Sequence, residues 1–377
     1  MKITSILWTK ILLVLTLIII IFVSTLNYVV DPYSLYKTNF FPNKPKEFEY
    51  MRLVKAINVE KIKPSSIVLG TSRAEMAINP DHKYFIQPAY NLSNAGSTMY
   101  ETKYYLKQTI EQGNLKKVIL VADWIMFNNM DTKKVADFET YFSDRNIYKY
   151  LLNYKVLEDS IFTIKNHNIQ SYHKINGQMT DSHAEMVLIA NGGQYKTMLK
   201  EEKDYYKKYF YGNKYRDTHK NSFEDLKEIL ELCYKNNVEL DIVFGPSHIR
   251  QWEAFDYYKD METFYKWKKD VVLFVEKIAK KQNEKPFRVM DFAVYHELTA
   301  EKVLQGKDDR MKYHIENSHY TETLGNIVLD RLIGISPYKD FGIELNSQNI
   351  DSHIKKLRED RIKFIDKKAY RKEVFGE

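Results

Sequence analysis

The sequence predicts a mixed α/β protein built on a doubly wound parallel sheet, with an N-terminal membrane helix. Residues 66–70 and 117–123 are short, unbroken apolar runs, which are typical of parallel strands that helices cover on both faces. Longer segments of helical periodicity alternate with such runs, as in βαβ units. The chain has 377 residues, 44% of them hydrophobic, and is therefore long enough to bury a substantial core.

This alternation gives the order of the elements in a domain that we expect over residues 51–336. The expected strands are residues 66–70, 89–93, 117–123, 239–245 and 287–292. The expected helices are residues 98–113, 222–236, 261–281 and 321–334.

The alternation lapses over residues 129–220. A structureless loop of that length is improbable inside a compact domain. We therefore expect an inserted, mainly helical subdomain, which either packs on the core or forms a lid or substrate groove.

The N-terminus predicts attachment to the lipid bilayer. After a short tail, residues 1–10, the uncharged residues 11–30 are long enough, at about 1.5 Å per residue, to cross a hydrocarbon core of about 30 Å. A cleaved signal peptide is the alternative, but no small-x-small cleavage site follows, so we expect an uncleaved single-pass anchor in the cell membrane. The short tail favours an inside N-terminus and an exported main domain. Residues 31–50 form an aromatic, proline-containing juxtamembrane connector.

Composition excludes several classes of protein. The single cysteine, Cys233, excludes an intramolecular disulfide framework. The 29 tyrosines are scattered rather than set in a stacking motif, so no nucleic-acid partner is expected. The net charge of +7 is unevenly distributed: within the C-terminal tail, residues 337–377, residues 355–377 hold nine Lys or Arg against five Asp or Glu. This basic tail is either a solvated helix or frayed end, or a contact for anionic lipid or polymer.

Ligands of open parallel sheets bind beyond the carboxyl ends of the strands, and polar residues of this chain follow each expected strand. Ser72 comes after the first strand, where a helix begins; a serine there is either an ordinary N-cap or a nucleophile. A serine nucleophile requires a general base. In "IENSHYTETLGN", His319 precedes the last expected helix and Glu316 lies three residues before it, a spacing that lets the carboxylate orient the imidazole.

Other chemistries find less support in the sequence. No His-x-x-x-His motif is present, and His314 with His319 is too sparse a pair to hold a metal, so no metal or other cofactor is expected. A nucleotide-binding domain is disfavoured because "LGTSRAE" lacks a glycine-rich phosphate loop.

The order of these motifs resembles the SGNH (GDSL-like) hydrolase superfamily, and within it a membrane-anchored branch of envelope O-acyltransferase-like and teichoic-acid D-alanylation-like proteins. The matching segments are "VLGTSR", "NLSNAGST" and "ENSHY", together with "DPY", "GPSH" and "MDF". The resemblance implies a flavodoxin-like, three-layer fold. It also implies that Ser72 is the nucleophile, His319 the base with Glu316 behind it, and Gly96 a backbone donor to the oxyanion.

The chain departs from the SGNH pattern in two places. Glu316 stands where the superfamily has Asp, and the Gly-x-Asn-Asp block that supplies a side-chain oxyanion donor is absent after the third strand. Asn128 is favoured for that donor and Asn94 is a further candidate, whereas Asp123 would repel an oxyanion unless it were protonated or paired.

Two further residues at the strand ends are candidates for substrate contact. Arg73, beside Ser72, either binds an anionic substrate group or forms a surface ion pair. His248, after the fourth strand, either contacts substrate or caps a loop.

The resemblance implies an acyl esterase or O-acyltransferase that acts on a cell-envelope glycan or polymer through an acyl-Ser72 intermediate. Because the domain is expected outside the membrane, a transferase would need a membrane partner protein that passes acyl groups across. The alternative is a catalytically inactive scaffold or binding component of an envelope-assembly complex, which the missing Gly-x-Asn-Asp block would suit.

Overall fold

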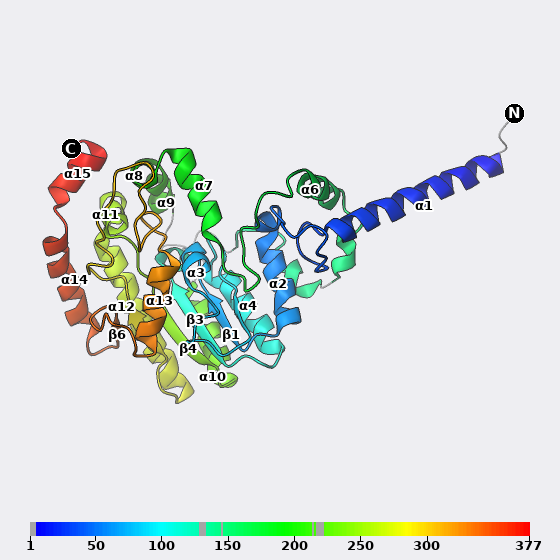
Figure 1. Ribbon diagram of the computed structural model, residues 1–377. Coiled ribbons are helices and arrows are strands. Elements are labelled where there is room, and N and C mark those ends of the chain that lie inside the picture. Colours follow the sequence, from blue (N-terminus) through cyan, green and yellow to red (C-terminus); the bar gives the residue numbers. More distant parts are fainter. Residues whose placement is uncertain (1–4, 128–132, 145, 213–214, 216–221) are drawn as a thin grey trace. The chain divides into compact units, whose positions relative to one another are not determined.

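The computed structural model describes residues 5–127, 133–144, 146–212, 215 and 222–377 (Figure 1). The chain forms two compact units. The first, here the anchor unit, comprises Met1–Asn58 and Glu139–His173, and the second, here the sheet unit, comprises Val59–Phe138 and Lys174–Glu377. Helix α2 (Met51–Ile62) carries the chain from one unit to the other.

The sheet unit contains a six-stranded, mostly parallel sheet, which confirms the predicted mixed α/β class. The strand order is β2-β1-β3-β4-β5-β6, and only β6 is antiparallel to its neighbour. The strands are β1 (Ser66–Leu69), β2 (Ala89–Asn91), β3 (Lys117–Ala122), β4 (Glu239–Phe244), β5 (Arg288–Asp291) and β6 (Ile343–Leu345). The five strands predicted from the sequence are therefore β1 to β5, each one or two residues shorter than expected.

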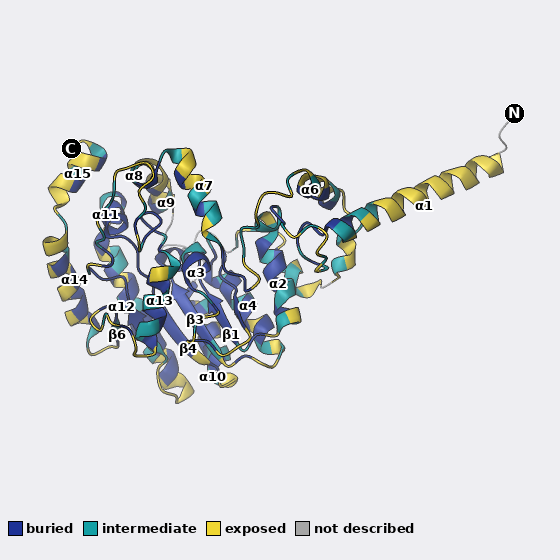
Figure 2. Cartoon of the chain, in the orientation of Figure 1, coloured by how far each residue is buried: buried dark blue, intermediate teal, exposed yellow. Residues whose placement is uncertain are grey.

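The centre of the sheet is apolar because β1 and β3 are covered on both faces. Every residue of β1 is buried, as are Val118–Ala122 of β3 (Figure 2). From β1 the chain first moves outward to β2 and then returns to the other side of β1 to form β3. The carboxyl ends of β1 and β3 are thus the point where the strand order reverses, which is where doubly wound sheets bind ligands.

Helices lie on both faces of the sheet (Figure 1). The four predicted helices are observed as α4 (Met99–Glu111), α10 (Ser222–Lys235), α12 (Met261–Gln282) and α13 (Glu322–Leu332). The other helices of the sheet unit include α3 (Ser72–Ala77), η2 (Trp124–Phe127), α7 (Asp181–Asn191), α8 (Gln194–Lys200), α9 (Tyr206–Gly212) and α11 (Ile249–Tyr258). Between α8 and α9 runs η4 (Glu201–Tyr205), a turn of π-helix.

The segment expected as one insertion is divided between the two units. Residues 139–173 belong to the anchor unit, whereas residues 174–212, with α7, α8, η4 and α9, belong to the sheet unit. Residues 133–138 of the same segment also belong to the sheet unit.

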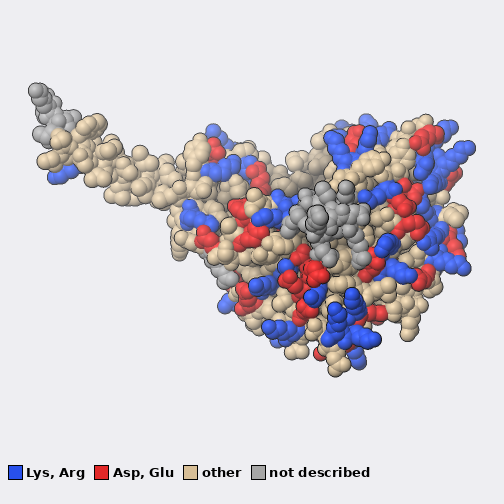
Figure 3. All heavy atoms as spheres, turned by 180° about the vertical axis from the view of Figure 1, so that it is seen from behind, with Lys and Arg blue, Asp and Glu red and all other residues tan. Residues whose placement is uncertain are grey.

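The sheet unit also continues past residue 336, where we expected the domain to end. Residues 337–377 contribute β6, α14 (Ile350–Phe364) and α15 (Lys367–Phe375). Arg361 of α14 forms ion pairs with Glu253 and Asp256 of α11. On the face shown in Figure 3, blue and red side chains alternate over the part of the sheet unit that carries these helices. The C-terminal segment is therefore held by paired charges.

The anchor unit contains α1 (Ser5–Val30), the one helix among the described residues that is long and apolar enough to cross a membrane. The rest of the unit is η1 (Glu47–Tyr50), α5 (Thr140–Ser143), η3 (Ile147–Tyr150) and α6 (Tyr154–Lys165). Its small core is formed by Tyr33, Leu35, Met51, Val54 and Val156. Residues 5–22 of α1 are all exposed, whereas Asn27 and Val30 near its end are buried in this unit.

Candidate active site

Ser72, His319 and Glu316 form a continuous chain of hydrogen bonds at the carboxyl end of the sheet. His319 Nε2 lies 2.7 Å from Ser72 Oγ, and the other ring nitrogen, Nδ1, contacts Glu316 Oε1. This geometry satisfies the distance of about 2.6 to 3.2 Å that proton transfer between a hydroxyl and a general base requires. The structure thus brings together the three residues that the sequence proposed as nucleophile, base and orienting carboxylate.

A tight hairpin places Glu316 and His319 in this arrangement. His314 and Tyr320 form an antiparallel bridge across the hairpin. The Glu316 carboxylate accepts hydrogen bonds from the backbone N–H of His319 at 2.7 Å and of Ser318 at 2.9 Å. The Ser318 hydroxyl also donates to Glu316 Oε1, at 2.9 Å. The carboxylate therefore both fixes the hairpin and orients the imidazole.

Ser72 is positioned by two glycines that allow close packing. It is the first residue of α3, directly after the N-cap residue Thr71. A Cβ on Gly70 would lie 2.8 Å from Ala74 Cβ and 3.0 Å from the Val121 carbonyl, so only glycine lets the chain turn here against β3. On the other side of α3, a Cβ on Gly325 of α13 would lie 1.9 Å from the Ala77 carbonyl. Because α13 directly follows the hairpin, this packing sets the distance between Ser72 and His319.

A second carboxyl group, that of Glu201 in η4, lies against Glu316. Burial and the neighbouring Glu316 charge raise the pKa of Glu201 well above its ordinary value, which favours the protonated form of Glu201. Burial alone would raise the pKa of Glu316, but the His319 ring and the hydrogen bonds from Glu201, His319 and Ser318 outweigh it and hold that pKa below its usual range. Of the two carboxyl groups, the ionised form is therefore favoured for Glu316, which contacts the imidazole.

Asp123 follows the end of β3, and its carboxylate contacts Thr71 and Arg73, the two residues that flank Ser72. It accepts a hydrogen bond from Thr71 Oγ1 and forms an ion pair of 2.8 Å with Arg73 Nη1. Burial would lower the pKa of Arg73, but the Asp123 charge raises it above its ordinary value, so the guanidinium stays charged. Of the two expected roles of Arg73, the ion pair is present, and Arg73 also lines the cavity described next.

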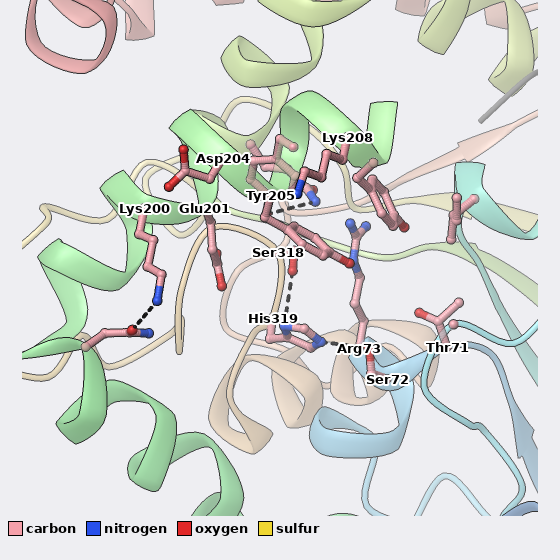
Figure 4. Close-up of a pocket in the computed structure, with 16 residues that line it drawn as sticks. Thr71, Ser72, Arg73, Lys200, Glu201, Asp204, Tyr205, Lys208, Ser318 and His319 are labelled. Atoms are coloured by element: carbon pink, nitrogen blue, oxygen red, sulfur yellow. Dashed lines mark hydrogen bonds between the residues drawn. The ribbon is translucent and has the colours of Figure 1, made fainter. Parts of the chain in front are cut away.

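The Ser72–His319 pair opens into a cavity of about 400 Å³ in the sheet unit (Figure 4). Besides Ser72 and His319, the cavity is lined by Thr71, Arg73, Gly96, Ile125, Asn191, Lys200, Glu201, Asp204, Tyr205, Tyr206, Lys208, Tyr209, Gln251 and Ser318. In Figure 4 the labelled side chains of η4 and α9 lie opposite His319 and Ser72. The cavity therefore joins the end of the sheet to a wall of tyrosines from residues 205–209.

The remaining predicted site residues are distributed differently. Gly96 lines the cavity with a φ of +62°, in the left-handed region that favours glycine. Asn94 is buried beside β2, where its side-chain amide donates to the Leu92 carbonyl. His248 caps α11, and burial, with help from His314, lowers its pKa to about 3, so the ring is neutral. Neither Asn94 nor His248 lines the cavity, and Asn128 lies outside the described residues.

Sequence reasoning missed the residues that the α8–α9 segment contributes, above all Glu201 and the tyrosines 205, 206 and 209. Their signal is present in "KEEKDYYKKYFY", where two adjacent glutamates precede a run of aromatic and basic residues. This stretch lies within the inserted region that the sequence predicted, and it contributes residues to the lining of the cavity. No group of three or more His, Cys, Asp or Glu residues within the described ranges is arranged to hold a metal ion.

Comparison with known proteins adds no family to this geometry. A scan of the chain against protein-family models gives no match, and a search of curated proteins gives none either.

Proposed function

We propose that this protein is a membrane-anchored, SGNH-like serine acyl esterase or O-acyltransferase. One observation carries the proposal: the hydrogen-bonded chain from Glu316 through His319 to Ser72, which ends at a cavity large enough for an acyl ester. A serine hydroxyl becomes a competent nucleophile when a base accepts its proton and a carboxylate holds that base.

The chemistry proceeds in two transfers. In the first, Ser72 Oγ attacks the ester carbonyl while His319 Nε2 takes the hydroxyl proton, and the C–O bond to the alcohol breaks as His319 returns that proton to the leaving oxygen. In the second, water or a sugar hydroxyl attacks the acyl-Ser72 ester with the same proton transfers. Water gives a carboxylic acid and a sugar hydroxyl gives a new ester, and Ser72 is regenerated in both cases.

The site must also stabilise the charges that develop in the transition state, on the oxyanion and on the imidazole. The backbone N–H groups of Ser72 and Gly96 are the proposed oxyanion donors. Ser72 is the first residue of α3, and the first N–H groups of a helix lack intrahelical partners. Gly96 lies in the turn between β2 and α4 and lines the cavity. Glu316, held ionised, stabilises the imidazolium that forms at His319.

The substrate and location belong to the same proposal. We take the substrate to be an acylated glycan or polymer of the cell envelope, reached by an exported sheet unit whose N-terminal helix stays in the membrane. The end of α1 is integrated in the fold, because Asn27 is fully buried and donates to the Leu151 carbonyl at 2.9 Å. This integration favours a retained anchor over a cleaved signal. A transferase would receive its acyl group from a membrane partner protein.

Turnover of a chromogenic acyl ester by the purified full chain tests the proposal. Wild type and Ser352→Ala, which removes an exposed hydroxyl on α14, are expected to turn over p-nitrophenyl acetate, and Ser72→Ala is expected to be inactive. Transfer of the acetyl group to an added oligosaccharide would identify a transferase. Equal turnover by wild type and a well-folded Ser72→Ala variant would contradict the proposal, and an absence of turnover in both would favour the inactive scaffold.

A further inference from the structure

We propose that the loop formed by residues 146–154 of the anchor unit is a membrane-contacting surface that lies in the interfacial layer of the bilayer. The loop comprises η3 and the residues up to the start of α6. The inference rests on the proposed membrane span of α1, and it assigns a role to a segment that the proposed chemistry does not use.

The loop is joined to α1 by direct hydrogen bonds. Asn27 Nδ2 donates to the carbonyl oxygens of Leu151, at 2.9 Å, and Asn153, at 3.4 Å. Ser160 of α6 donates to Asn27 Oδ1 at 3.0 Å, so the side-chain amide of Asn27 is held from both sides. Tyr36, whose ring packs against Tyr28 of α1, donates its hydroxyl to the Ile147 carbonyl at 2.8 Å. The height of the loop along the α1 axis is therefore fixed.

That height coincides with the edge of the hydrocarbon core. About 20 helical residues cross a core of about 30 Å. A span that begins anywhere from Ser5 to Ile11, just after Lys10, ends between Ser24 and Val30. Asn27 lies in the middle of this range, so the loop bonded to it lies within about 5 Å of the boundary, at about 1.5 Å per residue. Figure 3 shows the exposed part of α1 as uncharged except near its N-terminal end.

The side chains of the loop have the chemistry of an interfacial contact. Tyr148, Leu152 and Tyr154 are 70%, 58% and 73% exposed. Tyrosine is enriched at membrane–water interfaces, where its ring is apolar and its hydroxyl remains hydrated. The one basic residue of the loop, Lys149, is paired with Asp144 at 2.9 Å, and Lys155, the residue after the loop, is paired with Asp159 at 3.1 Å. The surface therefore suits the apolar–polar boundary of a lipid layer rather than a charged partner.

Depth-dependent fluorescence quenching tests the inference on the full chain. Cysteine would be introduced at Leu152, at Ile18 in α1 and at the exposed Gln282 of the sheet unit, labelled with the fluorophore NBD, and reconstituted in phosphatidylcholine vesicles. The native Cys233 is buried, and burial raises the pKa of its thiol to about 12, so unmodified chain serves as the labelling blank.

We expect the label at position 152 to emit at a shorter wavelength than the label at position 282 and to be protected from quenching by iodide. We also expect a shallow nitroxide lipid to quench it more than a deep one does. The label at position 18 should be quenched more by the deep nitroxide. If position 18 is not quenched by lipid, the span fails and the inference with it. If position 18 is quenched but position 152 is open to iodide, the span stands and the inference is overturned. Protection of position 152 from both iodide and lipid nitroxides would indicate a protein contact and would also overturn it.

Discussion

The imidazole of His319 lies 2.7 Å from the hydroxyl of Ser72, although the two residues are 247 positions apart in the chain. Neither residue belongs to a strand: Ser72 is the first residue of α3, and His319 lies in the hairpin that precedes α13. The distance between these two side chains therefore depends on how α3 and α13 pack at the point where the strand order reverses.

The charge on Glu316 is expected to determine the activity of His319. Glu316→Gln keeps the shape of the side chain but removes the charge and permits the wrong imidazole tautomer, so we expect kcat/KM for ester turnover to fall by about 10²- to 10⁴-fold. Glu316→Asp restores the charge with a side chain shorter by one methylene, and an intermediate rate is expected. Steady-state kinetics with a melting curve of each variant measure this, and a Gln variant as active as wild type would exclude the proposed role.

We expect the free energy of unfolding to fall as pH rises through the pKa of Glu201, and we expect Glu201→Gln to remove this effect. Its pKa is raised in the folded state, so its favourable contribution is fully present below the unfolded value of about 4.3 and is lost as pH rises through the folded pKa. Ionisation then places a second carboxylate beside Glu316. Glu201→Gln retains a donor and cannot ionise.

Urea unfolding of wild type and Glu201→Gln, measured from about pH 4.3 upward, compares how the free energy of unfolding of each protein changes with pH. The stability of wild type should fall more steeply with rising pH than that of the variant. Glu228→Gln, at a half-exposed glutamate on α10, is the matched control and should follow wild type. Parallel curves for wild type and Glu201→Gln would show that the two carboxyl groups do not share a proton.

Gly325 is expected to control the distance between Ser72 and His319. In Gly325→Ala, a Cβ only 1.9 Å from the Ala77 carbonyl must push α13 away from α3. Over-packing of this kind typically costs about 1 to 3 kcal/mol, and a shift of about 1 Å at the reacting atoms can cost about 10²-fold in rate. Gly212→Ala on α9, where a Cβ would meet no atom within 4 Å, is the control. Unfolding and ester turnover would be measured, and equal behaviour of the two variants would refute the packing argument.

The buried ion pair between Lys268 and Asp291 predicts an asymmetric response to mutation. Lys268 Nζ lies 2.7 Å from Asp291 Oδ2, and His353 Nε2 lies 2.8 Å from the same oxygen. Asp291→Asn leaves a buried ammonium group without a charge partner, so we expect a loss of about 3 to 5 kcal/mol in the free energy of unfolding. The double variant Lys268→Met/Asp291→Asn should recover much of that loss, and failure to recover it would contradict this interpretation.

The Lys268–Asp291 pair also predicts a loss of folding stability at low pH. Burial would raise the pKa of Asp291, but Lys268 and His353 hold it below its ordinary value. Its contribution is therefore present above about 3.9 and is lost as pH falls through the folded pKa. Wild type should lose more stability below pH 4 than the double variant in urea titrations.

The sheet and the three residues of the hydrogen-bonded chain are predictable from local sequence. Buried parallel strands are continuous apolar runs, and the rule that ligands bind at their carboxyl ends selects the turn that carries Ser72. His319 stands out because it precedes the last expected helix, and Glu316 because it lies only three residues before His319.

Other parts of the site depend on contacts between distant segments. Glu201 meets Glu316 across 115 positions of chain because the α8–α9 segment packs over the strand ends, and no local pattern encodes that pairing. The antiparallel β6 is three residues long and carries too short a pattern to distinguish from a loop. The ion pair between Asp123 and Arg73 likewise could not be predicted from the sequence, because each of these residues was also a candidate for contact with substrate.

Peptide mass spectrometry after treatment of the folded, full-length protein with a fluorophosphonate gives the most direct measurement. Ser72 is expected to carry the phosphonate adduct, and His319→Ala should abolish or greatly slow its formation because the hydroxyl then lacks its base. The absence of an adduct on Ser72 in protein shown to be folded, or equal labelling of wild type and His319→Ala, would contradict the proposal that these residues form an acyl-transfer site.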